Sequence, residues 1–207
     1  MKMFSKSLIA ISMLSAVSAS HASEGFYVGA NIGQSNYDIN SNEFASALGS
    51  ITTVLSSSAD DSDTSFSFTF GYQLNPNLSF EGGYINLGEV GVDVVIYENP
   101  YVIDVNTAIE TDGLFFDIKG QVPINAVFSI YGKIGVLKWD SDITVTLSNV
   151  DLGNYTDSES VDEDDTFFGV GGSVILSKDE NNSMVLNIDY TLYELDDLDV
   201  DVLSLGV

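Results

Sequence analysis

Residues 64–73 read TSFSFTFGYQ, and this stretch decides the fold. Every second side chain is aromatic, and the side chains between them are small or polar. Because a β-strand points successive side chains to opposite faces, the stretch predicts a strand with one apolar and one polar face. The aromatic face carries Phe66, Phe68, Phe70 and Tyr72.

The same alternation recurs along most of the chain. The residues NPN at 75–77 predict a tight turn. In the strand that follows, Phe80 and Tyr84 lie on the face opposite to Glu81, so a hairpin joins these two strands. The segments with this period predict eight strands, at residues 26–35, 64–73, 78–87, 114–122, 128–139, 168–176, 186–192 and 200–207.

The connections between these strands differ in length in a regular way. Short turns at residues 75–77, 123–126 and 178–183 alternate with long connections at residues 36–63, 88–111 and 140–165, and a brief one follows at residues 194–199. Short turns at one end and long loops at the other are typical of barrels in outer membranes. We therefore expect an all-β fold, an antiparallel up-and-down transmembrane β-barrel of eight strands over residues 23–207.

The first residues predict export. Lys2 and Lys6 precede an apolar run, and Ser20 and Ala22 supply the small side chains that a signal peptidase reads. The run of about ten residues is too short for a membrane-spanning helix, which needs about 20. We expect residues 1–22 to be a cleaved signal peptide and the remainder to reach the outer membrane of a Gram-negative cell.

The composition excludes several classes of function. The chain has a net charge of -25, no Cys, and His21 as its one His. Phosphate groups need clustered Lys and Arg, so we expect no nucleic acid partner. Catalysis by His or Cys, zinc sites and disulfides need side chains that are absent after His21. We expect a protein that is not an enzyme and that has no cofactor and no metal.

The direction of the alternation separates two kinds of barrel with eight strands. A soluble ligand carrier has an apolar interior, whereas a membrane barrel has an apolar exterior. Charged residues from several strands share the polar face, and they fit a small lumen. We favour the membrane barrel over the soluble carrier. The residues expected to face lipid are Phe66, Phe68, Phe70, Tyr72, Phe80, Tyr84, Phe116, Phe168 and Tyr190.

Several strands resemble one known family, the transmembrane domain of outer membrane protein A (OmpA-like). The matching segments are FYVGANIG at 26–33, GYQLNP at 71–76, FEGGY at 80–84, IYGKIG at 130–135 and LSLGV at 203–207. The resemblance covers the strands and none of the long loops. It implies a barrel of eight strands that the outer-membrane insertion machinery recognises, surrounded by outer-membrane lipids and lipopolysaccharide.

The polar face supplies candidate lumen residues. Glu81 and Lys119 lie on neighbouring predicted strands, and a charge in a narrow lumen is stable only when it is paired, so we expect an ion pair. The resembled family fills its interior with such pairs. A second acid and base of that family correspond to Ser173 and Asn187 here, which cannot pair. The other expected polar lumen residues are Asn31, Asp117, Lys133 and Asp189.

Two interpretations of this lumen are open. In the first, polar side chains simply fill the barrel, because eight strands leave room for little else. In the second, the pair of Glu81 and Lys119 gates a narrow, porin-like path of low conductance.

Carboxylates concentrate in the predicted long connections. They include Asp60, Asp61, Asp63, Asp157, Glu159, Asp162, Glu163, Asp164 and Asp165. None of these runs has the spacing of a calcium loop, so a solvated surface is favoured over loose cation bridging to lipopolysaccharide. We predict a monomeric outer-membrane protein with a structural or cell-surface interaction role, acting through long acidic extracellular loops on an external partner that the sequence does not identify.

Overall fold

The computed structural model describes residues 24–39, 52–149, 151, 153–178, 182–195 and 198–207. The predicted signal peptide lies outside these residues. No helix among them is long and apolar enough to cross a membrane. The described strands are β1 (Gly25–Tyr37), β2 (Thr53–Asp60), β3 (Ser62–Asn75), β4 (Leu78–Glu98), β5 (Tyr101–Pro123), β6 (Phe128–Asn149), β7 (Gly153–Lys178), β8 (Ser183–Leu195) and β9 (Leu198–Gly206).

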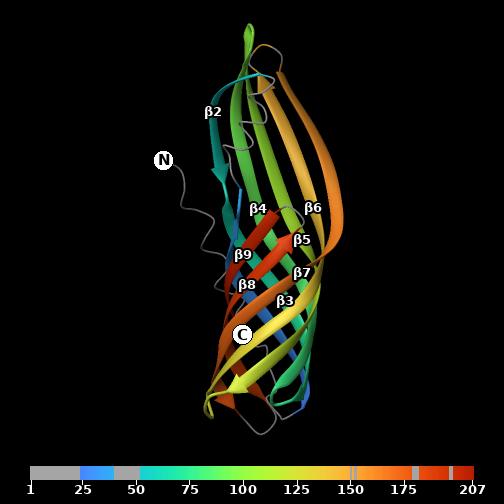
Figure 1. Cartoon of the computed structure of the whole chain (residues 1–207), viewed down its shortest axis with the longest axis vertical. Coiled ribbons are helices and arrows are strands. Elements are labelled where there is room, and N and C mark those ends of the chain that lie inside the picture. Colours follow the sequence, from blue (N-terminus) through green and yellow to red (C-terminus); the bar gives the residue numbers. More distant parts are fainter. Residues whose placement is uncertain (1–23, 40–51, 150, 152, 179–181, 196–197) are drawn as a thin grey trace.

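The strands close into a ring of antiparallel pairs (Figure 1). The order β4-β3-β1-β9-β8-β7-β6-β5 returns to β4 through the pairing of β4 with β5. β2 is not a further member of this ring, because only Asp61 separates it from β3 and it pairs with the later part of β4. The predicted barrel of eight antiparallel strands is therefore confirmed.

The predicted long connections are mostly strand. Only residues 99–100 separate β4 from β5, and only residues 150–152 separate β6 from β7. The described residues of 88–111 and 140–165 therefore form hairpins, so the prediction of long loops there is wrong, as it is for the part of 36–63 that forms β2. The physical reason is that β-branched residues continue through 88–111 and through the β6 arm of the second hairpin, where they favour paired strands, and the acidic β7 arm pairs with that β6 arm.

Four strands are much longer than the others. β4, β5, β6 and β7 have 21, 23, 22 and 26 residues, whereas β1 and β8 have 13 each. A membrane-spanning strand needs about 9–11 residues. The surplus forms, with β2, a curved sheet beyond the ring, which we call the projecting sheet (Figure 1). The tight turns after β3 and β5 lie at the opposite end of the ring, and short turns of this kind are periplasmic in outer-membrane barrels.

An apolar belt surrounds the lower part of the ring. Phe68 and Phe70 on β3 are 60% and 57% exposed, and the rings of Phe26 and Phe70 stack with centroids 5.4 Å apart. Strand alternation directs all the residues expected to face lipid to this outer surface. They are exposed or half-buried there: Phe66, Phe68, Phe70, Tyr72, Phe80, Tyr84, Phe116, Phe168 and Tyr190.

The barrel interior becomes apolar toward the projecting sheet. Residues from six strands form one buried cluster, which we call the apolar plug. Phe167 lies within it, 1% exposed, with its ring 5.1 Å from Tyr193 and 6.1 Å from Phe115. The plug consists of Tyr37, Ile85, Leu87, Val90, Leu137, Trp139, Phe167, Tyr193, Leu195, Val200 and Val202.

A β-bulge marks the passage from the ring to the projecting sheet. The register of β4 against β5 shifts between Asn86 and Glu89, and Gly88 within this shift has φ +85°. A Cβ at position 88 would lie 2.7 Å from the Cβ of Asp63, so both conformation and space require glycine. The Glu89 N–H donates to Asp63 Oδ2 over 2.8 Å, which ties the bulge to β3.

The apolar plug predicts a contrast between two neighbouring phenylalanines. Phe167→Ala should cost about 3–5 kcal/mol in the free energy of unfolding, because it leaves a cavity among rigid aromatic rings. Phe168→Ala is the matched control, since its side chain lies on the outer surface, and it should cost clearly less. Urea unfolding of the detergent-folded barrel measures both. Equal losses would contradict a packed plug.

Candidate functional site

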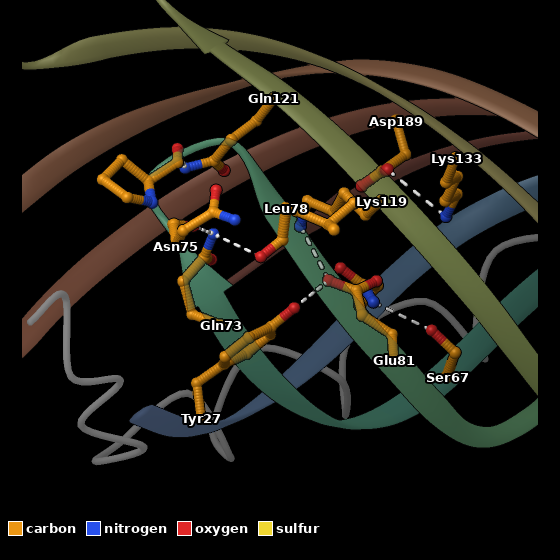
Figure 2. A network of polar contacts seen from close by, with 12 residues as sticks. Tyr27, Ser67, Gln73, Asn75, Leu78, Glu81, Lys119, Gln121, Lys133 and Asp189 are labelled. Atoms are coloured by element: carbon orange, nitrogen blue, oxygen red, sulfur yellow. Dashed lines mark hydrogen bonds and ion pairs between the residues drawn. The ribbon is translucent and has the colours of Figure 1, made fainter. Parts of the chain in front are cut away.

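Glu81 and Lys119 meet in the lumen, on the periplasmic side of the apolar plug. The Lys119 Nζ lies 2.8 Å from Glu81 Oε1, and the Tyr27 hydroxyl of β1 donates to the same oxygen (Figure 2). Glu81 is 6% exposed. On β5 the residue directly opposite Glu81 is Asp117, and Lys119 is the next inward-pointing residue. The carboxylate thus receives two donors from two different strands.

A second ion pair lies beside the first. The Nζ of Lys133 on β6 is 3.4 Å from Asp189 Oδ1 on β8 (Figure 2). Lys119 and Lys133 are directly opposite each other on β5 and β6, which would be unfavourable for unpaired like charges. Each lysine is instead neutralised by its own carboxylate. The Lys119 Nζ also lies 4.4 Å from the centroid of the Tyr131 ring, a favourable cation–π contact.

Lys133 reaches Asp189 across the intervening strand β7 because the residue there is glycine. Gly169 pairs with Lys133 on one side and with Thr191 on the other. A Cβ at position 169 would lie 2.5 Å from Lys133 Cε. Gly169 is therefore required for the path of the lysine side chain to its carboxylate.

Asp117 is the unbalanced member of the lumen group. Its side chain is 1% exposed, and neither carboxyl oxygen has a hydrogen-bond partner among the described residues. It lies directly opposite Glu81. The described lumen thus brings three acids together with only two lysines, so one carboxyl group has no cation of its own.

The remaining predicted lumen residues complete a polar cavity. Asn31 Nδ2 donates to Ser67 Oγ over 2.9 Å. Ser173 and Asn187 are directly opposite each other on β7 and β8, and both line the cavity without an ionic contact. The cavity has a volume of about 70 Å³, room for a few water molecules.

Side chains line both ends of this cavity. At the end with the tight turns, Gln73 Nε2 donates to the Leu78 carbonyl over 3.2 Å, and Gln121 Nε2 donates to the Pro76 carbonyl over 2.9 Å. At the other end, Phe167 lines the cavity and also belongs to the apolar plug. The arrangement can hold buried charges and a little water. Across the described ranges, no group of three or more acidic, His or Cys side chains is placed to hold a metal.

Most of the acidic residues expected in long loops lie on strands. Asp157 and Glu159 are exposed residues of β7 that pair with Val145 and Ile143 of β6. Lys138 offers partial compensation, since its Nζ lies 3.8 Å from an oxygen of Asp162 and the same distance from one of Asp164, with all three side chains largely exposed. The prediction of acidic loops is therefore corrected to an acidic sheet.

Sequence reasoning missed the apolar plug, although a signal for it exists. Strict alternation leaves only one face apolar, whereas Phe115–Phe116 and Phe167–Phe168 are consecutive aromatic residues. Such doublets place one aromatic ring outside and the next inside, because successive strand residues point to opposite faces. Phe115 and Phe167 are the inward members, in contact within the lumen.

The buried ion pair predicts a large cost when one partner is removed. Lys119→Met should lower the free energy of unfolding by about 3–5 kcal/mol, because Glu81 is left as an uncompensated buried charge. Lys138→Met is the control, since it removes an exposed pair worth at most about 1 kcal/mol. Urea titration compares the two. Adding Glu81→Gln to Lys119→Met should recover much of the loss, and equal costs for both lysines would contradict the pairing.

The unbalanced acid predicts a stabilising substitution. Asp117→Asn should raise the free energy of unfolding by up to about 1 kcal/mol, because it removes a like charge directly opposite Glu81 and adds an N–H donor. Asp189→Asn is the matched control, and it should destabilise the barrel because it removes the partner of Lys133. If Asp117→Asn lowered the free energy of unfolding as much as Asp189→Asn, Asp117 would not be the acid without a cation.

Two solved structures are similar to this chain at low sequence identity. Ail, the attachment invasion locus protein of Yersinia pestis, is 16% identical, with a TM-score of 0.46 over 88% of this chain and 95% of Ail. OprG from Pseudomonas aeruginosa is 14% identical, with a TM-score of 0.39 over 91% of this chain and 96% of OprG. A search of curated proteins found no match. Residues 7–207 match the outer membrane protein beta-barrel domain family, and the chain therefore belongs to this family of outer-membrane proteins.

Proposed function

We propose that this outer-membrane barrel presents its projecting sheet for contacts at the cell surface. The observation that carries the proposal is the continuity of β4 to β7 from the membrane ring into the projecting sheet, without a loop between the two parts. Residues that serve the membrane ring alone would end near its rim, since about 9–11 residues cross it. The additional length builds an ordered surface outside.

The projecting sheet has two different faces. The face that continues from the lumen carries Val92, Val94 and Val105 in a second buried cluster. Near β7 the same face is more open, and Leu147 and Tyr155 are 36% and 63% exposed. An exposed apolar surface bordered by charged residues is typical of an interaction site.

We also propose the partners of the membrane part. The apolar belt fits the acyl chains of outer-membrane lipids and lipopolysaccharide, because its outward side chains are aromatic or aliphatic. No catalytic role is assigned to the lumen, in which each lysine is paired with a carboxylate. A monomer suffices for this function, because the ring closes within one chain.

A narrow channel is the weaker candidate function. It is favoured by the polar cavity around Glu81 and Lys119. Against it stands the apolar plug, in which Leu87, Leu137 and Val200 are fully buried. A hydrated ion that crossed the plug would lose its water without gaining polar partners.

Planar-bilayer recordings separate the two functions. We expect no single-channel events for the wild type, and none for Lys119→Ala, because the plug lies above the ion pair and does not depend on it. A channel gated by the pair would instead conduct more in Lys119→Ala. Reproducible events that increase in this variant would favour the channel and oppose a closed barrel.

Trimming the projecting sheet tests the surface function directly. Residues 144–158 are replaced by Asn-Gly, which closes a short hairpin on the paired residues Ile143 and Glu159. The variant should still insert and show different gel migration before and after heating. Bacteria that display it should attach to surfaces and to other cells no better than bacteria without the protein. Full attachment by the trimmed variant would refute the proposal.

A further inference from the structure

β7 has a long open edge in the projecting sheet. It pairs with β6 along its whole length but with β8 only from Phe167 to Lys178. Between Gly153 and Asp164, no strand among the described residues pairs with its other side. Figure 1 shows this part of β7 along the border of the projecting sheet, beyond the ends of β8 and β9.

The backbone groups that this edge directs away from β6 can be assigned residue by residue. The Ile175 N–H donates to the Val127 carbonyl over 2.9 Å, and the register of β6 and β7 continues from there without a shift. Since alternate residues of an antiparallel strand bond to opposite sides, the odd-numbered residues of β7 bond to β6. The N–H and C=O groups directed away from β6 belong to Asn154, Thr156, Ser158, Ser160, Asp162 and Asp164, and the Ser158 N–H among them donates to Asp157 Oδ1 over 3.1 Å.

The edge lacks most of the features that usually prevent strand addition, and its remaining protection is its row of carboxylates. Short length, Lys, Pro and bulges protect most edge strands. β2, at the other border of the projecting sheet, is protected in this way, with 8 residues and a register shift between Val54 and Ser56. The open part of β7 contains no Lys or Pro, and its pairing has no register shift.

Charge along the edge selects among the chains that could pair with it. On the inner face, the open part of β7 presents Tyr155, Asp157, Glu159, Val161 and Glu163. Asp157 and Glu159 line a surface groove of about 330 Å³ together with Ile143, Val145 and Leu147 of β6. Two copies of this chain paired edge to edge would bring these carboxylates together, which is unfavourable. An added strand with cationic side chains opposite Asp157 and Glu159 would neutralise them.

We propose that the open edge of β7 binds an extended, cationic polypeptide segment as an additional strand. This inference rests on the proposed surface function and names the partner of the projecting sheet. Backbone bonds to the even-numbered residues supply affinity, and alternate Lys or Arg side chains opposite Asp157, Glu159 and Glu163 supply selectivity. Apolar side chains opposite Tyr155 and Val161 complete the inner face of the added strand.

A synthetic peptide tests the proposal on the full protein, which is purified from outer membranes and kept folded in detergent. The sequence KTVTKTKTV places Lys and Val opposite the inner-face residues when it runs antiparallel to β7. The same peptide N-methylated on every Thr keeps its charge but loses the N–H groups that would bond to β7. We expect saturable binding of the first peptide, monitored by fluorescence anisotropy, and an affinity about tenfold lower for the methylated one.

Substitutions in β7 test the same edge by changing the protein in place of the peptide. Ser158→Pro removes an outward N–H, which donates to Asp157 Oδ1, without removing a bond to β6. Ser158→Ala is the control that loses the same hydroxyl contact with Thr144. Ser160→Pro is the second edge variant in case Ser158→Pro does not fold, as judged by gel migration before and after heating. We expect either proline variant to bind the peptide about tenfold more weakly, and the alanine variant to bind it with unchanged affinity.

The outcomes are distinct. Equal binding of both peptides, no binding, or unchanged binding by the folded proline variants would overturn strand addition. Self-association of the wild type that Ser158→Pro abolishes would identify a second copy as the occupant and overturn the cationic partner. If the peptide fails to bind while trimming residues 144–158 still abolishes attachment, the surface function stands without this inference. If the peptide binds and trimming leaves attachment intact, the surface function fails instead.

Discussion

The structure depends on one constraint, that no backbone N–H or C=O group can remain unpaired in lipid. β1 pairs with β3 and β9, and β5 pairs with β4 and β6, so the ring has no edge within the membrane. Outside the membrane, water satisfies these groups and the constraint ends. The ring accordingly opens into the projecting sheet, bordered by β2 and β7. The same strands therefore form a closed barrel in lipid and an open sheet in water.

Closing eight strands also determines the interior. Every second side chain of the ring points inward, and a lumen of this width must be filled. The chain fills it in two ways, with ion pairs near the periplasmic end and with the apolar plug toward the outside. Lys119 and Lys133 are two of only six lysines in a chain with 31 acids. Their placement in the lumen leaves the projecting sheet strongly acidic.

Much of the barrel could be predicted from alternation alone. The stretch from Phe66 to Tyr72 determines which face is apolar, and the tight turn at residues 75–77 sets its partner strand. The inward positions of Glu81 and Lys119 follow from the same period. The prediction of long loops was wrong because clustered carboxylates are typical of solvated loops, whereas β7 keeps a continuous register with β6 from Gly153 to Val174. The route of Lys133 past Gly169 depends on contact across three strands, which no local pattern encodes.

The continuity of β4 to β7 has a mechanical consequence. A force applied at the hairpin tips near residues 99–100 and 150–152 acts along the strands, so it loads many hydrogen bonds of the ladder in parallel. Peeling a flexible loop would instead break contacts one at a time. The projecting sheet thus transmits tension applied at its tip to the membrane ring without lengthening. The bulge at Gly88 lies where the ring passes into the projecting sheet, on the path of that tension.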